Sequence, residues 1–271
     1  MKKTTFLIFL TLLVHLSCWG QKSDSSSVKK WENFISIGAG GSYSSVLDEG
    51  ISPLLYKGIG GAGLISTRDE NAKLLIQTMT RFDFNVVESS ESGRQMYAYR
   101  FEETLELYLK KWRLVKTPLT IDPGFGVQYK WLLRSHQSYT NNSQHLENKL
   151  SFYVGGHSQY DFKLFNRDFE IGNFLRLPLL SYVVRPIYAG AQSPGTLGKE
   201  DPSFFDYLKG GNVYTWGKYF EIDLQTYLNY NFKDSPNGIS LSYFWTYESL
   251  NTVNPSKEGQ HALVFSLNVK L

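Results

Sequence analysis

The sequence MYAYRFEETLELYLK, residues 96–110, alternates apolar and polar side chains over most of its length. Aromatic and aliphatic residues such as Tyr99, Phe101 and Leu107 share one parity, whereas Arg100 and Glu106 belong to the other. An α-helix would scatter both sets around its axis, but a β-strand sends successive side chains to opposite faces. The stretch is also far longer than the usual strand of about five or six residues. A long strand with one apolar and one charged face is typical of a transmembrane β-barrel.

The same alternation recurs along the rest of the chain. It predicts ten strands, an even number, as single-chain bacterial barrels require. We therefore predict an all-β fold in which residues 31–271 form a single closed antiparallel transmembrane β-barrel with its strands in an up-and-down meander. The predicted strands are residues 33–43, 55–66, 73–86, 96–110, 118–133, 148–162, 168–180, 215–232, 238–248 and 260–271.

The lengths of the connections support the barrel independently. Counted from the N-terminus, the even connections have about five to seven residues and the odd ones about nine to 34. Bacterial barrels show this rhythm, with short periplasmic turns and longer extracellular loops. A soluble β-sandwich would also have strands separated by turns, but it needs neither strands this long nor this rhythm. The even connections are 67–71, 111–117, 163–167 and 233–237, and the odd ones are 44–54, 87–95, 134–147, 181–214 and 249–259.

The chain begins with the features of a secretory signal peptide. Lys2 and Lys3 form a charged start, and the apolar run FLIFLTLLVHL, residues 6–16, is too short to span a bilayer. We predict cleavage before Gln21, which makes residues 1–20 the signal peptide. Residues 21–30 are rich in Ser and in charge, and we predict that they form a flexible lead-in.

Cysteine content and net charge exclude several classes of protein. Cys18 is the only cysteine, which excludes an intramolecular disulfide. Residues 16–18 (LSC) faintly resemble the acylation box of lipoproteins, and the alternative is that Cys18 leaves with the signal peptide. Removal of Lys2 and Lys3 leaves 26 bases against 25 acids, so there is no basic excess of the kind that nucleic-acid binding requires.

The polar parity of the strands predicts the contents of the lumen. Ten strands give a backbone radius of about 10 Å, so inward side chains should largely fill the bore. Acids and bases are mixed in the inward set, and charges taken out of water need partners. The sequence therefore favours a hydrogen-bonded plug over a narrow polar pore. The predicted lumen residues are Arg81, Asp83, Arg100, Glu102, Glu106, Lys130, His157, Asp161, Glu170, Arg176, Glu221 and Asp223.

Glu103 departs from this pattern because it falls on the apolar parity of residues 96–110. The register of a hairpin would set it near Thr80, and an acidic side chain in lipid is costly. A bulge, a position near the membrane interface and a contact with a partner are the three explanations that the sequence leaves open.

The sequence shows no catalytic site. His157 and Ser158 are adjacent, so a strand points them to opposite faces and they cannot act together as nucleophile and base. Metal-ligand spacings and phosphate-binding loops are absent, so we predict neither a metal site nor a cofactor. His136 and His145 lie in the third odd connection, and an Asp or Glu within hydrogen-bond distance of either would favour a surface hydrolase.

The longest connection, residues 181–214, is the best candidate for a functional loop, since loops longer than about 15 residues are usually functional or disordered. Its apolar start, with Val183 and Val184, predicts that the first part is ordered over the barrel mouth. Binding at the surface and a passive lid both stay open.

Three stretches give the chain a resemblance to known barrels. CWGQ at residues 18–21, the aromatic-rich strands and LRLPLLSYVVRP at residues 175–186 resemble the small outer-membrane β-barrels of the Bacteroidota. This resemblance implies an outer-membrane location, contact with outer-membrane lipid and no activity. The C-terminal alternation of Phe265, Leu267, Val269 and Leu271 resembles the signal read by the barrel-assembly machinery, although such signals usually end in an aromatic residue.

The strand count also resembles that of the omptin proteases, which hold Asp and His residues at the barrel mouth. Asp83 lies near the predicted outer end of residues 73–86, and His136 and His145 lie in the third odd connection. The omptin motif does not match residue by residue, so no catalytic role carries over.

These observations lead to one main functional hypothesis and two alternatives. We expect a non-enzymatic outer-membrane barrel with a plugged polar lumen and a structural or surface-interaction role through its loops. Charges that cross the bore in pairs would support this hypothesis. A continuous wet path past Arg81, Arg100 and Glu221 would instead indicate a narrow channel for small polar solutes. The second alternative is a surface hydrolase with its site at the mouth.

Overall fold

The computed structural model describes residues 31–110, 119–138, 143–165, 167–186, 194–201, 203–233, 235–252 and 254–271. The predicted signal peptide (1–20), the lead-in (21–30), Cys18 and the predicted connection 111–117 lie outside the described residues. Among the described residues, no helix has the length and apolar character needed to cross a bilayer.

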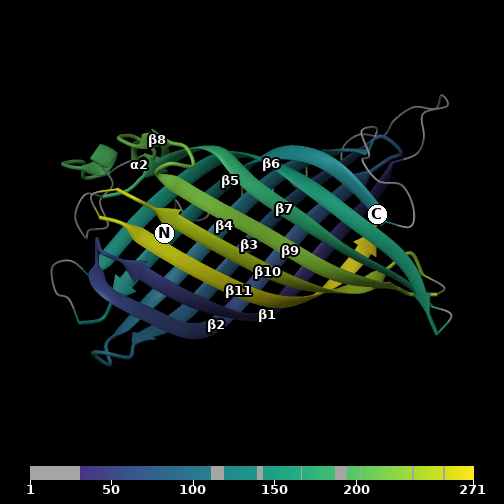
Figure 1. Ribbon diagram of the computed structural model, residues 1–271, viewed down its shortest axis with the longest axis horizontal. Coiled ribbons are helices and arrows are strands. Elements are labelled where there is room, and N and C mark those ends of the chain that lie inside the picture. Colours follow the sequence, from purple (N-terminus) through teal and green to yellow (C-terminus); the bar gives the residue numbers. More distant parts are fainter. Residues whose placement is uncertain are drawn as a thin grey trace.

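Ten long antiparallel strands form a closed barrel in the described part of the chain (Figure 1). Consecutive strands pair with each other, and β1 closes the ring by pairing with β11. The predicted all-β fold, a closed antiparallel barrel in an up-and-down meander, is confirmed. The barrel strands are β1 (Glu32–Asp48), β2 (Ser52–Glu70), β3 (Leu74–Ser89), β4 (Gln95–Leu109), β5 (Leu119–His136), β6 (Gln144–Leu164), β7 (Arg167–Val184), β9 (Tyr219–Asn231), β10 (Gly238–Leu250) and β11 (Ser256–Lys270).

The barrel has two unlike ends. The terminal end is where β1 begins and β11 finishes, and the loop end is the opposite one. The connection from β7 to β9 at the loop end carries η3 (Pro194–Thr196), α2 (Phe204–Tyr207) and β8 (Asn212–Tyr214). Strand β8 lies outside the ring and pairs with residues 181–183 of β7. Figure 1 shows α2 and β8 at the opposite end of the barrel from the C-terminus.

The strands run further toward the loop end than the sequence pattern predicted. The predicted connection 44–54 is mostly strand, because β1 continues to Asp48 and β2 begins at Ser52. The predicted connection 249–259 shrinks in the same way, since β10 ends at Leu250 and β11 begins at Ser256. Toward the loop end polar residues occur on both strand faces, so the alternation of side chains fades although the backbone ladder continues.

The two faces of the barrel reverse the usual pattern of a soluble protein. Polar and charged side chains are buried inside, and large apolar side chains are exposed outside. Exposed apolar surface on this scale is typical of a protein that is solvated by lipid. The exposed apolar residues include Ile37, Ile59, Ile65, Phe82, Leu105, Phe125, Val127, Phe152, Leu241, Leu263, Phe265 and Leu267.

A bulge in β7 changes which of its side chains face the lumen. The register with β6 shifts between Phe152 and Tyr153, which leaves Leu179 without a partner residue. Before the bulge Arg176 faces inward, and after it Ser181 does, where its hydroxyl lies 2.8 Å from that of Ser151. A bulge of this kind bends the strand and changes the face to which the following side chains point.

Two neighbouring glycines of β2 predict opposite responses to the same substitution. A Cβ atom on Gly60 would overlap the carbonyl oxygen of Phe84 on β3, whereas Gly61 has only an ordinary neighbour, 4.0 Å away. Gly60→Ala should therefore lower the free energy of unfolding by about 1–3 kcal/mol, because the strands must separate to admit the methyl group. Gly61→Ala is the control and should stay within about 0.5 kcal/mol in the same urea titration. Equal effects of the two substitutions would contradict this close approach.

Candidate functional site

The lumen is the candidate site, because it gathers the predicted charged residues. Glu170 is half-buried at the terminal end, and Asp161 is exposed there because it lies close to the end of β6. The other ten lumen residues are at most 2% exposed. These ten are Arg81, Asp83, Arg100, Glu102, Glu106, Lys130, His157, Arg176, Glu221 and Asp223.

A middle tier of the network is centred on Arg81 of β3. Its guanidinium donates to Asp83 and Glu102, both at 3.1 Å, and lies 4.9 Å from the ring of Phe244 on β10. Lys130 of β5 pairs with Glu221 of β9 in the same region. Side chains from five different strands therefore meet in this part of the bore.

A second tier, nearer the terminal end, is centred on Arg176 of β7. Its Nη2 donates to Glu106 of β4 at 3.0 Å, and its Nη1 donates to Asp223 of β9 at 2.6 Å. The hydroxyls of Tyr108 and Tyr153 also donate to Glu106, both at 2.9 Å. The carboxylate of Glu106 is thus saturated by one guanidinium and two phenols.

A third tier lies at the loop end and was missed by the sequence pattern. Asp48 of β1 accepts hydrogen bonds from Arg134 at 2.7 Å and from Arg185, and it lies 3.0 Å from Nδ1 of His145. Arg185 also donates to Glu147 at 2.9 Å. Ser44, Val46 and Asp48 continue the inward-facing parity of the predicted strand 33–43, and all three are buried. Extending that parity along the sequence could have found this tier.

The loop-end tier joins the middle tier through Glu248 of β10. Lys149 lies 2.5 Å from one oxygen of Glu248, and Arg100 lies 3.1 Å from the other. Arg134 pairs with Glu258 at 2.5 Å, and Arg100 also donates to Gln260. The charges of the lumen therefore form a linked network rather than isolated pairs.

Several of these bonds cross the full width of the barrel. In a ring of ten strands, β5 stands opposite β11, β4 opposite β10, and β2 opposite β7. These strand pairs are joined by ion pairs of Arg134 with Glu258, of Arg100 with Glu248, and of Arg68 with Glu170 at 2.9 Å. The contact of Asp48 on β1 with His145 on β6 joins a fourth pair of opposite strands. The lumen charges thus cross the bore in pairs, which is the arrangement that the plug hypothesis requires.

The bore also holds buried apolar side chains. These side chains form clusters, and the sequence pattern did not identify them because it assigned apolar residues to the outer face. One cluster contains Ala62, Leu64, Met79, Phe244, Ala262 and Val264, and another contains Leu75, Tyr108, Phe174 and Tyr227.

The geometry of the histidines bears on the hydrolase alternative. Asp48 lies within hydrogen-bond distance of His145, as that alternative requires. However, the His145 side chain is fully buried, and its Nε2 has no hydrogen-bond partner among the described residues. His136 is also buried, with Nε2 2.8 Å from the hydroxyl of Tyr56, and Asp83 lies inside the bore beside Arg81. A general base must reach the proton that it abstracts, and this pair is enclosed.

His157 and Ser158 lie on opposite faces, as the alternation predicted. His157 is buried in the lumen with Nε2 2.9 Å from the hydroxyl of Tyr227. Ser158 accepts a hydrogen bond from Asn173 at 3.4 Å and is half-buried. The two side chains therefore have different partners.

Glu103 lies opposite Thr80, as the hairpin register predicted. The hydroxyl of Thr80 donates to the carboxylate of Glu103 at 2.7 Å. The register between β3 and β4 is unbroken, so a bulge does not explain the position. Thr67 and Thr78 form a second polar pair on the same outer surface, with their hydroxyls 2.7 Å apart. A contact of Glu103 with a partner stays a prediction.

Asp206 organises the described part of the connection between β7 and β9. Its carboxylate accepts hydrogen bonds from Lys199 at 2.6 Å, from the hydroxyl of Ser203 at 2.7 Å and from Lys209 at 2.9 Å. These bonds hold the pKa of Asp206 well below its usual range, and the bond from Lys199 contributes most. The ionised carboxylate therefore ties residues 199–209 together.

The lowered pKa of Asp206 predicts how this segment responds to acid. Above the unfolded pKa of about 3.9 the segment has the full benefit of the bonds, and the benefit is lost as the pH falls toward the folded pKa. Asp206→Asn should make trypsin cleavage after Lys199 and Lys209 several-fold faster at neutral pH. Asp168→Asn makes the same change at an exposed carboxylate away from this segment and should leave the cleavage rate unchanged. Equal cleavage rates for all three proteins would contradict this role of Asp206.

Comparison with known proteins supports the fold. No protein-family model matches the chain, and no curated protein matches it. Among solved structures, the outer membrane protease OmpT from Escherichia coli is similar over 92% of this chain and 99% of that one, at 12% identity and a TM-score of 0.51. The attachment invasion locus protein Ail of Yersinia pestis covers 88% of this chain and 99% of its own, at 12% identity and a TM-score of 0.33. At such identities the likeness to OmpT shows the barrel fold alone.

Proposed function

We propose that the chain is an integral outer-membrane barrel with a sealed lumen, which acts through its loop end in a structural or surface-interaction role. The observation that carries this proposal is the set of ion pairs that join opposite strands at three levels of the bore. Ions or solutes could pass only if buried charge pairs separated, and breaking a buried pair costs about 3–5 kcal/mol. A narrow channel past Arg81, Arg100 and Glu221 is disfavoured by the same pairs.

The membrane location belongs to this proposal. The exposed apolar belt supports contact with outer-membrane lipid, and the terminal end would face the periplasm because short turns lie there in bacterial barrels. The loop end would then face outward. The alternating C-terminal strand, with Phe265 and Leu267 exposed on the outer face, would present the signal to the barrel-assembly machinery. The Bacteroidota-type resemblance is consistent with this location.

We propose no enzymatic activity, because the Asp48–His145 pair is enclosed by the network. Asp48 is also held by Arg134 and Arg185, so its charge is already compensated. The exposed part of the loop end, which carries α2 and β8, is therefore the surface on which interaction is expected.

A labelling experiment tests the orientation and the outward role of the loop end. Lys209→Cys and Asp168→Cys place a thiol at exposed positions of the loop end and the terminal end, respectively. A membrane-impermeant thiol reagent should label Lys209→Cys on intact cells, and Asp168→Cys only after the outer membrane is permeabilised. The parent chain is the control for Cys18. Labelling of Asp168→Cys alone on intact cells would contradict the proposed orientation, and extraction of the protein without detergent would contradict membrane integration.

A further inference from the structure

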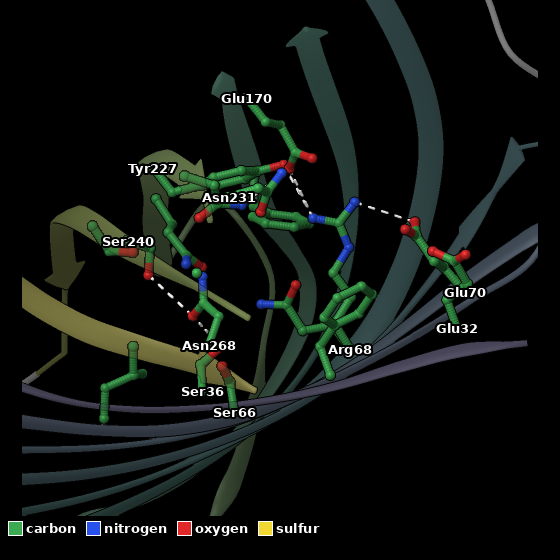
Figure 2. A pocket seen from close by; sticks show the side chains of 18 of the residues that line it. Glu32, Ser36, Ser66, Arg68, Glu70, Glu170, Tyr227, Asn231, Ser240 and Asn268 are labelled. Atoms are coloured by element: carbon green, nitrogen blue, oxygen red, sulfur yellow. Dashed lines mark hydrogen bonds and ion pairs between the residues drawn. The ribbon is translucent and has the colours of Figure 1, made fainter. Parts of the chain in front are cut away.

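A cavity of about 230 Å³ enters the barrel at the terminal end, on the far side of the Arg176 tier from the loop end. Figure 2 shows that Tyr227 and Ser240 on one side and Arg68 and Glu70 on the other project into the same space. Strands β1, β2, β3, β7, β9, β10 and β11 all contribute to its lining. The volume is below the range of about 300–1,000 Å³ for drug-sized ligands, so it suits a ligand of about one ring.

The charges that line this cavity are already neutralised. Arg68 lies 2.9 Å from Glu170 and 3.2 Å from Glu70, as the dashed lines in Figure 2 show. Lys110 lies 2.6 Å from Glu70, and Lys270 lies 3.1 Å from Glu32. Each carboxylate that lines the cavity therefore has a cation partner. A charged ligand would lose its hydration here without gaining a free countercharge.

Two neutral polar side chains of the lining are in the opposite condition. Gln77 and Ser242 are only 5% and 3% exposed, and both line the cavity. Neither side chain makes a hydrogen bond with any residue in the part of the chain that the structure describes. An amide offers both donors and an acceptor, and a hydroxyl offers one donor and an acceptor. Buried groups of this kind need partners, and a ligand with hydroxyl groups would supply them.

Two aromatic rings complete the lining. Phe174 and Tyr227 line the cavity with their ring centroids 5.5 Å apart. His157 holds them in place, since it stacks on Phe174 at 4.4 Å and its Nε2 lies 2.9 Å from the Tyr227 hydroxyl. The site therefore combines a rigid apolar wall with uncharged donors and acceptors. A sugar ring has matching chemistry, with apolar C–H faces and a rim of hydroxyls.

We propose that this cavity binds a small neutral polyhydroxylated ligand about the size of one sugar ring. The proposal goes beyond the proposed function, and it holds whether or not the bore conducts. In the proposed orientation the ligand would enter from the periplasmic side, away from the surface loops.

The test is saturation-transfer NMR on the full chain in a detergent that has no sugar headgroup. Glucose is the neutral compound to be measured. Glucosamine and glucuronate are its analogues with the same ring and a positive or a negative charge, respectively. We expect saturation transfer to glucose and about tenfold weaker binding of both charged analogues. Gln77→Leu and Ser242→Ala should each weaken glucose binding, Gln77→Leu by about tenfold. Gln144→Leu, at the loop end, is the matched control.

Three results would overturn the proposal. Glucose could show no saturation transfer, a charged analogue could bind as well as glucose, or both cavity variants could bind glucose like the parent chain. Heat-modifiable migration on gels shows whether each variant is folded. If Gln77→Leu fails to fold, Ser242→Ala decides the outcome, because it removes a single oxygen atom.

Discussion

Arg176→Met should lower the free energy of unfolding by about 3–5 kcal/mol, the largest loss that we expect from one substitution in the terminal half of the barrel. Arg176 donates to Glu106 and Asp223, and both carboxylates are buried. Methionine has a similar length but no charge, so the variant leaves two acids in the bore without their shared cation. Urea unfolding of the folded barrel in lipid vesicles measures the loss.

The control for Arg176→Met is the same loss of a cation from an ion pair at the surface. Lys163 and Asp168 lie 3.4 Å apart, with side chains 78% and 68% exposed. Lys163→Met should change the free energy of unfolding by less than about 1 kcal/mol. A loss for Arg176→Met as small as that for Lys163→Met would show that the cross-bore pairs do not hold the barrel together.

Asp48→Ala should have a comparable effect at the loop end, again about 3–5 kcal/mol. The substitution leaves Arg134 and Arg185 without the carboxylate that lies between them, and it removes the tie from β1 to His145 on the opposite wall. Because Arg185 begins the connection to β9, we also expect faster proteolysis of that connection. The unfolding midpoint in urea and the rate of trypsin cleavage measure the two effects separately.

Glu49→Ala is the matched control for Asp48→Ala, because Glu49 is the neighbouring acid and its side chain is exposed. It should change stability by less than about 0.5 kcal/mol. If Asp48→Ala destabilised the barrel without faster cleavage of the connection, the anchoring role of Arg185 would be wrong.

The sequence predicted the barrel well because its alternation is strong where one face is apolar. Residues 96–110 give the clearest case, and β4 covers Gln95–Leu109. The position of Glu103 opposite Thr80 also follows from the hairpin register alone. Strand β9 shows the limit of this reasoning, since it begins at Tyr219 rather than at residue 215. There the amide of Lys218 donates to the carbonyl of Thr215, which makes a turn.

The candidate site was only partly predictable. Parity assigned Arg81, Arg100 and Arg176 to the lumen, because charged residues stood opposite apolar ones. It missed Asp48 and Arg134, which were placed in connections because polar residues on both faces hide the alternation there. It also missed Phe174 and Met79, because an apolar side chain inside a barrel looks like one that faces lipid. Which acid pairs with which base depends on strands that meet only in the closed ring.

Single-channel conductance in a planar bilayer tests the sealed lumen most directly. Heat-modifiable migration first establishes that the purified protein is folded. We expect the folded parent protein to give no conductance steps, because ion pairs cross the bore at three levels. A steady conductance that changes in Arg81→Gln or Arg100→Gln would contradict the sealed lumen and would assign the protein to the narrow channels.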